Sequence, residues 1–251
     1  MNINVLWTGG WDSTFRIAQL SRMSGVSIQG IYIVGDKRPS ESREIEAINS
    51  IISALMLKED TKAKLMPLRI IKKEDIPSNQ RITEAFNRLC KKNRLGTQYE
   101  WLARFAYVSP GVELGAIMPD GEFSGVRETI NKYGGLLKDG NSYRLDFEKA
   151  TEDCRLIFGN FGYPLAFTKE REMVDIIADW GYQDIMKLTW FCHRPYKGRP
   201  CGICRPCEQK MEGKMEFLLP NDAKKRYKIM KIATSVAGNR GRQCLFKLYN
   251  I

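Results

Sequence analysis

The sequence predicts an α/β fold in which helices cover both faces of a parallel sheet, followed by a small C-terminal module. Three observations support this prediction. Short apolar runs alternate with longer segments in which apolar residues recur at helical spacing. A glycine pair separates the first apolar run from the first helical segment, where doubly wound sheets place their ligands. A cluster of cysteines stands apart near the C-terminus.

The alternation assigns an expected structure to each segment. Strands are expected at residues 3–7, 28–34, 64–71, 112–117 and 155–161, and helices at residues 13–24, 40–57, 80–92, 97–107 and 169–181. Residues 119–153 break the rhythm, and their glycine-rich turn signals predict an insertion or a hairpin over the active site. We therefore expect an α/β domain over residues 1–185 and a C-terminal module with a basic tail over residues 186–251.

The first predicted strand runs directly into Thr8-Gly9-Gly10-Trp11-Asp12-Ser13-Thr14. The glycines let the backbone approach a phosphate, and the free amides and dipole of the following helix hold its charge. Asp12, Ser13 or Thr14 can cap that helix. The loop is neither a Walker A loop nor a G-x-G-x-x-G dinucleotide fingerprint, because both patterns are absent. The sequence therefore predicts an anion site at this turn.

Four of the seven cysteines fall within sixteen residues: Cys192, Cys201, Cys204 and Cys207. Four thiolates close a tetrahedral zinc shell with no open position. Gly202 and Pro206 suit the turns of the knuckle. The spacing predicts a structural zinc site, with reduced thiols in a loop as the alternative. The only histidine, His193, is a second potential ligand beside Cys192 or a residue near the pocket.

These two motifs together carry a resemblance. The stretch from Thr8 to Ser13 resembles the S-G-G-x-D-S loop of the PP-loop ATP pyrophosphatase superfamily, with threonine in place of the first serine. Within that superfamily, T-W-F-C ending at Cys192 and C-G-I-C-R-P-C ending at Cys207 resemble the 7-cyano-7-deazaguanine synthase (QueC) family. The resemblance spans roughly residues 3 to 210. It implies an adenine nucleotide alpha hydrolase-like, Rossmann-like fold.

The resemblance also implies a chemistry. The loop would hold the pyrophosphate of ATP, with Mg²⁺, while a carboxylate of the 7-carboxy-7-deazaguanine type attacks the α-phosphorus. Ammonia would then displace AMP, and a second ATP-driven step would dehydrate the amide to the nitrile. The implied ATP-binding residues are Trp7, Thr8, Gly9, Gly10, Trp11, Asp12, Ser13 and Thr14, and the implied catalytic residues are Asp12, Ser13 and Lys169.

Lys169 enters through a weaker similarity. Pro164–Lys169 is similar to the family's P-L-x-x-x-[ST]-K stretch before a helix, which implies that Lys169 meets phosphate or the adenylate. A solvated lysine at a helix start is the alternative. Asp12 likewise has two interpretations, a helix cap or a partner for Mg²⁺. Trp11 either stacks on adenine or is a packed aromatic residue.

The chain departs from the family at two places. The family's R-N pair opens the central helix near the nucleotide, whereas this chain reads Gln98-Tyr99-Glu100. The family's Y-P-D-C-R segment, which helps to hold the deazapurine, is replaced by Met118-Pro-Asp-Gly-Glu. ATP chemistry is thus better supported than the identity of the acceptor.

Composition limits the classes of protein further. No run of about eighteen apolar residues appears, which argues against a membrane span. The N-terminus lacks the pattern of a signal peptide, so we expect a cytoplasmic protein with reduced thiols. The net charge of +11 favours acidic partners such as nucleotides, RNA or an acidic protein surface. The basic tail, Lys224 to Arg242, is interpreted first as a solvated helix face and second as an RNA or protein docking surface.

The sequence thus predicts an ATP-dependent carbon–nitrogen ligase resembling 7-cyano-7-deazaguanine synthase, with structural zinc and a family tendency to form homodimers. Three alternatives remain open. One is a relative that joins the activated deazapurine to another amine such as a protein, as in antiviral defence operons. Another is a PP-loop enzyme that modifies tRNA. The third is a non-enzymatic, zinc-dependent nucleic-acid binder.

Overall fold

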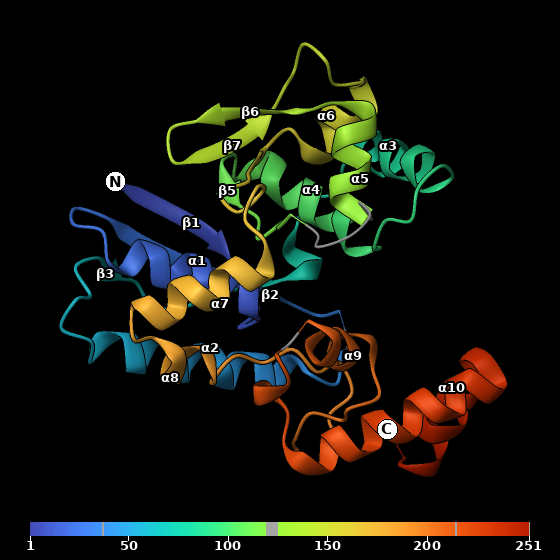
Figure 1. Ribbon diagram of the computed structural model, residues 1–251. Coiled ribbons are helices and arrows are strands. Elements are labelled where there is room, and N and C mark those ends of the chain that lie inside the picture. Colours follow the sequence, from blue (N-terminus) through green and yellow to red (C-terminus); the bar gives the residue numbers. More distant parts are fainter. Residues whose placement is uncertain (37, 119–124, 214, 251) are drawn as a thin grey trace.

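A computed structural model describes the chain except for residues 37, 119–124, 214 and 251 (Figure 1). Its centre is a parallel sheet in the order β3-β2-β1-β5-β8, and β4 also pairs with β2. Every pairing in this sheet is parallel, which confirms the predicted fold class. The strands are β1 (Asn2–Leu6), β2 (Ser27–Val34), β3 (Lys64–Leu65), β4 (Arg69–Lys72), β5 (Val112–Glu113) and β8 (Phe161–Gly162).

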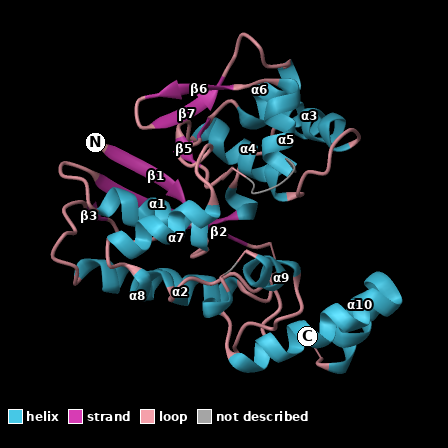
Figure 2. Ribbon diagram, in the orientation of Figure 1, coloured by secondary structure: helices cyan, strands magenta, loops and turns pink. Residues whose placement is uncertain are grey.

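Helices cover both faces of the sheet, as predicted (Figure 2). Side chains alternate along a strand, so Val5 and Trp7 pack into one apolar cluster and Leu6 into the other. One face carries α1 (Trp11–Ser21), α2 (Glu41–Met56), α7 (Glu170–Asp179) and α8 (Gln183–Met186). The other carries α3 (Gln80–Cys90), α4 (Gln98–Val108), α5 (Gly125–Tyr133) and α6 (Glu152–Phe158).

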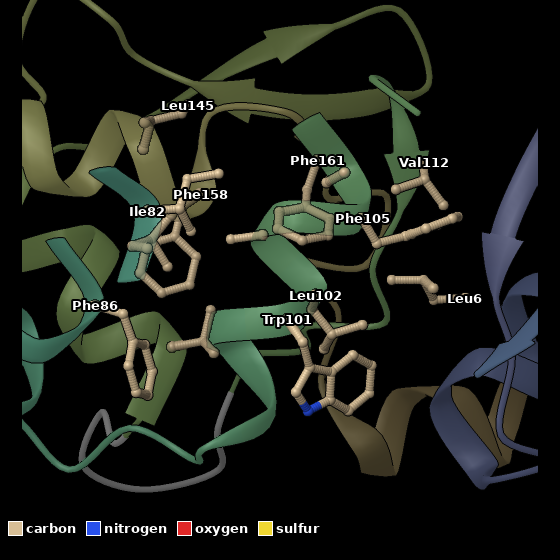
Figure 3. Packing of buried hydrophobic residues seen from close by; sticks show 14 of the residues in the cluster. Leu6, Ile82, Phe86, Trp101, Leu102, Phe105, Val112, Leu145, Phe158 and Phe161 are labelled. Carbon is tan, nitrogen blue, oxygen red and sulfur yellow. The ribbon is translucent and has the colours of Figure 1, made fainter. Parts of the chain in front are cut away.

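The second cluster positions α4, whose first turn reaches the site described below. Trp101 and Phe105 point from α4 into the apolar layer, between Phe86 of α3 and Leu6 of β1 (Figure 3). All four side chains are buried. Burial of such aromatic residues contributes about 2–3 kcal/mol each. The N-terminus of α4 is therefore fixed against the carboxyl ends of the strands.

Two predicted strands differ in the structure. The strand expected at residues 64–71 is divided into β3 and β4, with Pro67 between them, because proline cannot donate to a ladder. The strand expected at residues 155–161 is wrong, since residues 152–158 form α6. Thr151 caps that helix by accepting from the Cys154 amide at 3.4 Å. Cys154, Ile157 and Phe158 recur at helical spacing and are buried.

The predicted hairpin is present. It consists of the antiparallel strands β6 (Leu136–Asp139) and β7 (Ser142–Leu145), and Gly140 turns with φ +57°. The described residues of the hairpin line neither of the cavities reported below, so it does not cover them. Part of the Met118-Pro-Asp-Gly-Glu segment lies outside the described residues.

The C-terminal module contains α9 (Arg205–Glu212), a 3₁₀ turn at Glu216–Leu218, and α10 (Asn221–Leu248). In the α/β domain, a further 3₁₀ turn at Lys73–Asp75 follows β4. Gly238 interrupts α10, because its φ of +55° is not helical. Beyond this kink the chain returns onto itself, because a Cβ on Gly241 would lie 2.1 Å from the Ala233 carbonyl oxygen. The basic tail is therefore a helical hairpin. None of the described helices is both long and apolar enough to span a membrane.

Candidate functional site: a nucleotide loop beside a four-cysteine knuckle

The glycine pair connects β1 to α1 in a conformation that only glycine adopts freely. Gly9 has φ +69°, and a Cβ there would lie 2.9 Å from the Glu44 carbonyl oxygen. Gly10 is the N-cap of α1, and no side chain caps the helix. The expectation that Asp12, Ser13 or Thr14 caps α1 is therefore wrong.

The hydroxyl groups of Ser13 and Thr14 form other hydrogen bonds instead of capping α1. Ser13 Oγ donates to the Gly10 carbonyl at 3.4 Å, and Thr14 Oγ1 accepts from Trp7 Nε1 at 2.9 Å. The Thr14 amide forms the first intrahelical hydrogen bond, donating to the Gly10 carbonyl at 3.0 Å. An α-helix leaves its preceding amides without intrahelical acceptors. The start of α1 thus presents free N–H groups and the positive end of its dipole to an anion.

A cavity of about 240 Å³ opens on one side of this loop. Its walls come from the carboxyl ends of β1 and β2, the first turn of α1 and the first turn of α4. Apolar side chains, including Ile31, Trp101 and Leu102, form much of the lining, and Gln98 and Tyr99 add polar groups. This combination suits a flat heterocycle with a few hydrogen-bonding atoms. Gln98 and Tyr99 thus occupy the region near the predicted nucleotide.

A larger cleft, of about 940 Å³, adjoins this cavity and is lined by residues of both the α/β domain and the C-terminal module. Thr8, Gly10, Trp11, Asp12, Arg38 and Tyr99 line both cavities. The larger cleft also contains Arg127, Glu170, His193, Arg205 and Lys210. Desolvation and, next, the Arg38 cation lower the pKa of His193. The loop therefore lines two adjoining spaces, a small cavity and a wider cleft to which several cationic groups contribute.

Asp12 lies where these two spaces meet. Burial raises the pKa of its carboxyl group to about 6; Lys210 opposes this change and Glu170 adds to it. Asp12 Oδ1 is buried and has no hydrogen-bond partner among the described residues. A buried carboxylate oxygen without a partner is costly. A cation that accompanies the phosphates would offset that cost, so the residue fits the Mg²⁺ of Mg·ATP.

The four predicted cysteines converge in one buried cluster. The Sγ atoms of Cys192, Cys201, Cys204 and Cys207 all lie within 4.8 Å of one another. The Sγ–Sγ distances are 3.8 Å between Cys192 and Cys204, 3.9 Å between Cys201 and Cys207, and 3.5 Å between Cys204 and Cys207. A tetrahedron with Zn–S bonds of about 2.3 Å has edges of about 3.8 Å. The cluster can therefore bind a metal ion such as zinc.

Backbone amides surround the sulfur atoms. The Cys201 amide donates to Cys192 Sγ at 3.2 Å, and the Cys204 amide donates to Cys201 Sγ at 3.2 Å. Neighbouring thiols, first that of Cys192, lower the pKa of Cys201, whereas the thiols around them raise the pKa of Cys192 and of Cys207. Amides that donate to sulfur orient the four side chains. His193 is not part of the cluster, so the alternative in which it replaces a cysteine has no support.

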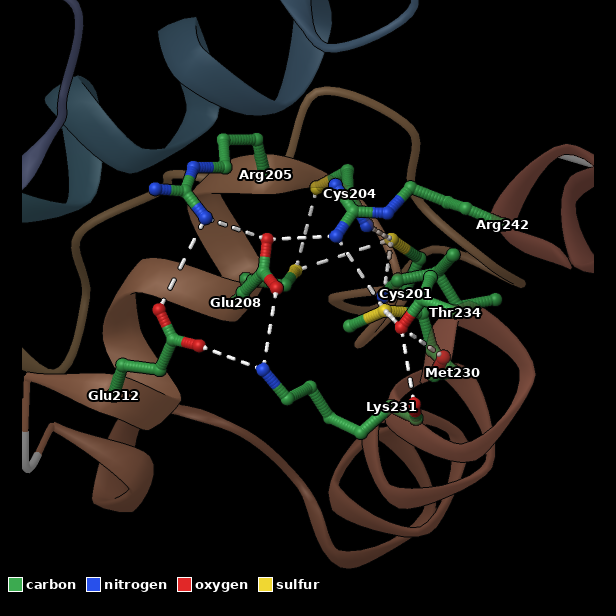
Figure 4. Close-up of polar contacts among 11 residues, drawn as sticks. Cys201, Cys204, Arg205, Glu208, Glu212, Met230, Lys231, Thr234 and Arg242 are labelled. Atoms are coloured by element: carbon green, nitrogen blue, oxygen red, sulfur yellow. Dashed lines mark hydrogen bonds and ion pairs between the residues drawn. The ribbon is translucent and has the colours of Figure 1, made fainter. Parts of the chain in front are cut away.

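The knuckle is tied to the rest of the module by charged side chains. Glu208 of α9, which is 5% exposed, accepts from Arg205 at 2.8 Å and from Arg242 of α10 at 2.7 Å (Figure 4). Lys231 lies 3.1 Å from Glu212. Arg226 donates to the Cys201 carbonyl at 2.7 Å. Part of the basic tail therefore supports the knuckle, which departs from its interpretation as a solvated face.

The knuckle also contacts the nucleotide loop directly. The Trp190 amide donates to the Gly9 carbonyl at 2.8 Å. A Cβ on Gly10 would lie 3.7 Å from the Trp190 carbonyl oxygen. The two sequence motifs, about 180 residues apart in the chain, are thus adjacent in space. Any metal that orders the knuckle also orders one wall of the cleft.

The structure places the predicted residues unequally. Trp7, Thr8, Gly10, Trp11, Asp12 and Ser13 line a cavity, whereas Gly9 and Thr14 belong to neither described lining. Trp11 is both packed and at the site: it is 3% exposed and meets the Phe217 ring at 6.2 Å. The described linings of both cavities exclude Lys169, whose amide donates to Glu172 at the start of α7. Its role at the phosphate stays a prediction.

Sequence patterns do not identify five charged residues that line the larger cleft: Arg38, Arg127, Glu170, Arg205 and Lys210. Arg38 follows β2 and donates to Glu44 at 2.9 Å. Glu170 and Lys210 form an ion pair between α7 and α9. Isolated charged residues carry no local signal, and the position of Lys210 three residues after Cys207 was the only available clue.

Comparison with known proteins gives little beyond this geometry. No family model and no curated protein matches the chain. Among solved structures, there is a distant similarity to the U34-tRNA thiolase NcsA from Methanococcus maripaludis with its 4Fe-4S cluster. The two are 12% identical with a TM-score of 0.39, and the match covers 98% of this chain and 72% of that chain.

Proposed function

We propose that the protein is an ATP-dependent adenylating enzyme that transfers AMP to an acceptor held in the larger cleft and releases pyrophosphate. One observation carries this proposal. The uncapped start of α1 lines both a small cavity suited to a nucleobase and an adjoining wide cleft suited to a second substrate. ATP bound there would direct its phosphates at the free amides of α1.

The proposed reaction has two steps. An oxygen of the acceptor carboxylate attacks the α-phosphorus, and the bond from that phosphorus to the bridging oxygen breaks. Pyrophosphate leaves with the electron pair, and the acceptor becomes an acyl-adenylate. An amine nitrogen then attacks the acyl carbon, AMP leaves with the electron pair of the C–O bond, and the nitrogen loses a proton to water. The residues contribute by positioning and by electrostatic stabilisation.

Mg²⁺ bound with ATP would neutralise negative charge on the phosphates. Asp12 is the residue of the loop that would hold it, because its Oδ1 lacks another partner among the described residues. Gly9 and Gly10 keep the backbone open to the pyrophosphate, and Ser13 adds its amide. The four-cysteine knuckle, with zinc bound, would act as a structural element that forms one wall.

For the acceptor we propose a carboxylate of the 7-carboxy-7-deazaguanine type, with ammonia as the amine. The resemblance of both motifs to 7-cyano-7-deazaguanine synthase supports this choice. Arg38, Arg127 and Arg205 line the larger cleft and suit an anionic acceptor. A protein amine in place of ammonia would use the same adenylate.

A second candidate is adenylation of a tRNA base. The cations Arg194, Lys197 and Arg199 are exposed on the C-terminal module, in the segment between Cys192 and Cys201. Exposed cations suit the phosphates of a nucleic acid. This candidate shares the nucleotide site with the first and differs only in what occupies the cleft.

The test is a mass-spectrometric assay of zinc-loaded protein with ATP and Mg²⁺. One reaction contains 7-carboxy-7-deazaguanine and ammonium, and a second contains unmodified tRNA. AMP and pyrophosphate with an amide or a nitrile support the first candidate, and AMP with a mass change in tRNA supports the second. The Gly9→Ala variant serves as the inactive control. Release of ADP and phosphate, or no binding of Mg·ATP, contradicts adenylation altogether.

A further inference from the structure

Lys210 connects the knuckle to the nucleotide loop. It lies on α9 three residues after the metal ligand Cys207, close to one helical turn. Its side chain leaves the knuckle and lines the larger cleft, where its ion-pair partner is Glu170 at the start of α7. Its Nζ lies 5.6 Å from the centre of the Trp11 ring and 3.8 Å from Met215 Sδ.

The burial of this lysine requires an explanation. Lys210 is only 7% exposed, although lysine side chains are usually exposed to solvent. A buried ammonium group is costly, and a buried ion pair stabilises a fold no better than apolar residues of similar volume. The pair of Lys210 and Glu170 therefore contributes little that a packed Met–Gln pair would not. Its position in the cleft suggests a task in binding.

The location of Lys210 identifies that task. It lines the larger cleft and is absent from the described lining of the smaller cavity. Its ammonium group therefore lies in the larger cleft, the proposed acceptor space, over the ring of Trp11, which belongs to both linings. The bond between the α-phosphate and the acceptor would form in this space. Two carboxylates, Asp12 and Glu170, lie near this single cation.

We propose that Lys210 binds the α-phosphate in the acceptor space beside the nucleotide loop, and that Glu170 holds its ammonium group in the cleft until the nucleotide arrives. The inference rests on the proposed function, because it assumes a nucleotide at the loop. When the phosphate binds, the Lys210 ammonium group leaves the Glu170 carboxylate and pairs with a phosphate oxygen. The Glu170 side chain, which is 19% exposed, then becomes hydrated. The metal knuckle then supplies a catalytic residue in addition to a wall.

The test measures phosphate recognition separately from nucleoside recognition. Isothermal titration with AMP, adenosine and Mg·ATP is performed on the unaltered protein and on the double variant Lys210→Met/Glu170→Gln. Replacing both partners preserves the charge balance, so the fold is expected to persist. The matched control is Lys58→Met/Asp184→Asn, which removes an ion pair of 3.1 Å outside both cavities. Zinc content and thermal midpoint are measured for each protein.

We expect the double variant to bind AMP at least tenfold more weakly and adenosine within twofold of the unaltered protein. The control pair should change neither. Unchanged AMP affinity, or an equal loss for AMP and adenosine, overturns the role of Lys210 while the proposed function stands. Failure of the unaltered protein to bind Mg·ATP or AMP overturns the proposed function instead.

A further variant keeps the test decisive if the double variant is unstable. Glu170→Gln alone frees Lys210 from its competitor, so AMP should bind as tightly as to the unaltered protein or more tightly. A tenfold loss of AMP affinity in Glu170→Gln contradicts a holding role for Glu170 and overturns the proposal.

Discussion

The nucleotide loop and the cysteine knuckle face each other across one cleft, yet they are built in different ways. The loop is continuous in sequence: a strand, two glycines and a helix set the positions of its amides. The knuckle gathers four side chains around a shared centre and has little regular structure before α9. The loop therefore depends on backbone conformation, whereas the four thiols of the knuckle can be held together by a metal ion.

This difference separates stability from binding. A substitution in the loop should mainly alter nucleotide affinity, because the sheet beneath it is held by two apolar clusters. A substitution in the knuckle should first alter the folding of the module. It should affect the nucleotide afterwards, through the Trp190–Gly9 contact. The four expected outcomes below test this division, from the largest effect to the smallest.

Cys201→Ser should have the largest effect. Structural zinc contributes about 10–16 kcal/mol of apparent binding free energy in zinc-finger peptides, and that energy is coupled to folding. We expect loss of bound zinc and a marked fall in the thermal midpoint, measured by elemental analysis and calorimetry. Cys244→Ser, at an exposed position outside the cluster, is the control. Equal zinc content and stability in both variants would contradict a structural metal.

Gly9→Ala should lower stability moderately and abolish nucleotide binding. The left-handed φ and the approach to the Glu44 carbonyl together cost about 2–4 kcal/mol, and relaxation would close the loop. Denaturant titration and Mg·ATP binding measure the two effects. Gly25→Ala is matched to it, since Gly25 has φ +73° with nothing within 4 Å of a Cβ. That control should lose about 1 kcal/mol and keep its affinity.

Asp12→Asn should change the pH dependence of stability. The pKa of Asp12 is about 6 in the folded protein and 3.8 when unperturbed, so the folded state binds the proton more tightly. The unaltered protein therefore loses stability as the pH rises through this range. Since asparagine does not ionise, the variant should gain about 2 kcal/mol relative to it between pH 4 and pH 7.

The same variant should weaken Mg·ATP binding, because it removes the proposed partner for Mg²⁺. Denaturation series and titrations at several pH values provide both measurements. Asp175→Asn, at an exposed position on α7 outside both cavities, should give curves parallel to those of the unaltered protein. Parallel curves for Asp12→Asn as well would show that the carboxyl group is not desolvated.

Arg242→Met should have the smallest effect. It removes one of the cations around Glu208, whereas Arg205 remains as a partner at 2.8 Å. We expect a loss of about 1 kcal/mol in the stability of the module, with zinc content and nucleotide affinity unchanged. Calorimetry measures the change. A loss of zinc in this variant would mean that the α9–α10 contact, rather than the cysteines alone, holds the knuckle together.

Local patterns identified much of this fold for a physical reason. The apolar alternation of β1 and the glycine pair after it depend on neighbouring residues, so they can be read directly. The error at residues 155–161 arose because Leu156, Ile157 and Phe158 form an apolar run that fits either structure. The hydrogen bond from the Cys154 amide to Thr151 Oγ1 caps the segment and favours a helix. The capping prediction for α1 failed because Gly10, rather than a polar residue, precedes it.

The sequence by itself determined the α/β class, the strand–glycine–helix loop and the four cysteines that can hold a metal. Each of these follows from residue type and spacing along one short segment. Only the tertiary structure decided that the loop and the knuckle share a cleft, that Asp12 is desolvated, and that Lys210 pairs with Glu170 there. Those facts depend on contacts between segments far apart in the chain, which residue spacing does not encode.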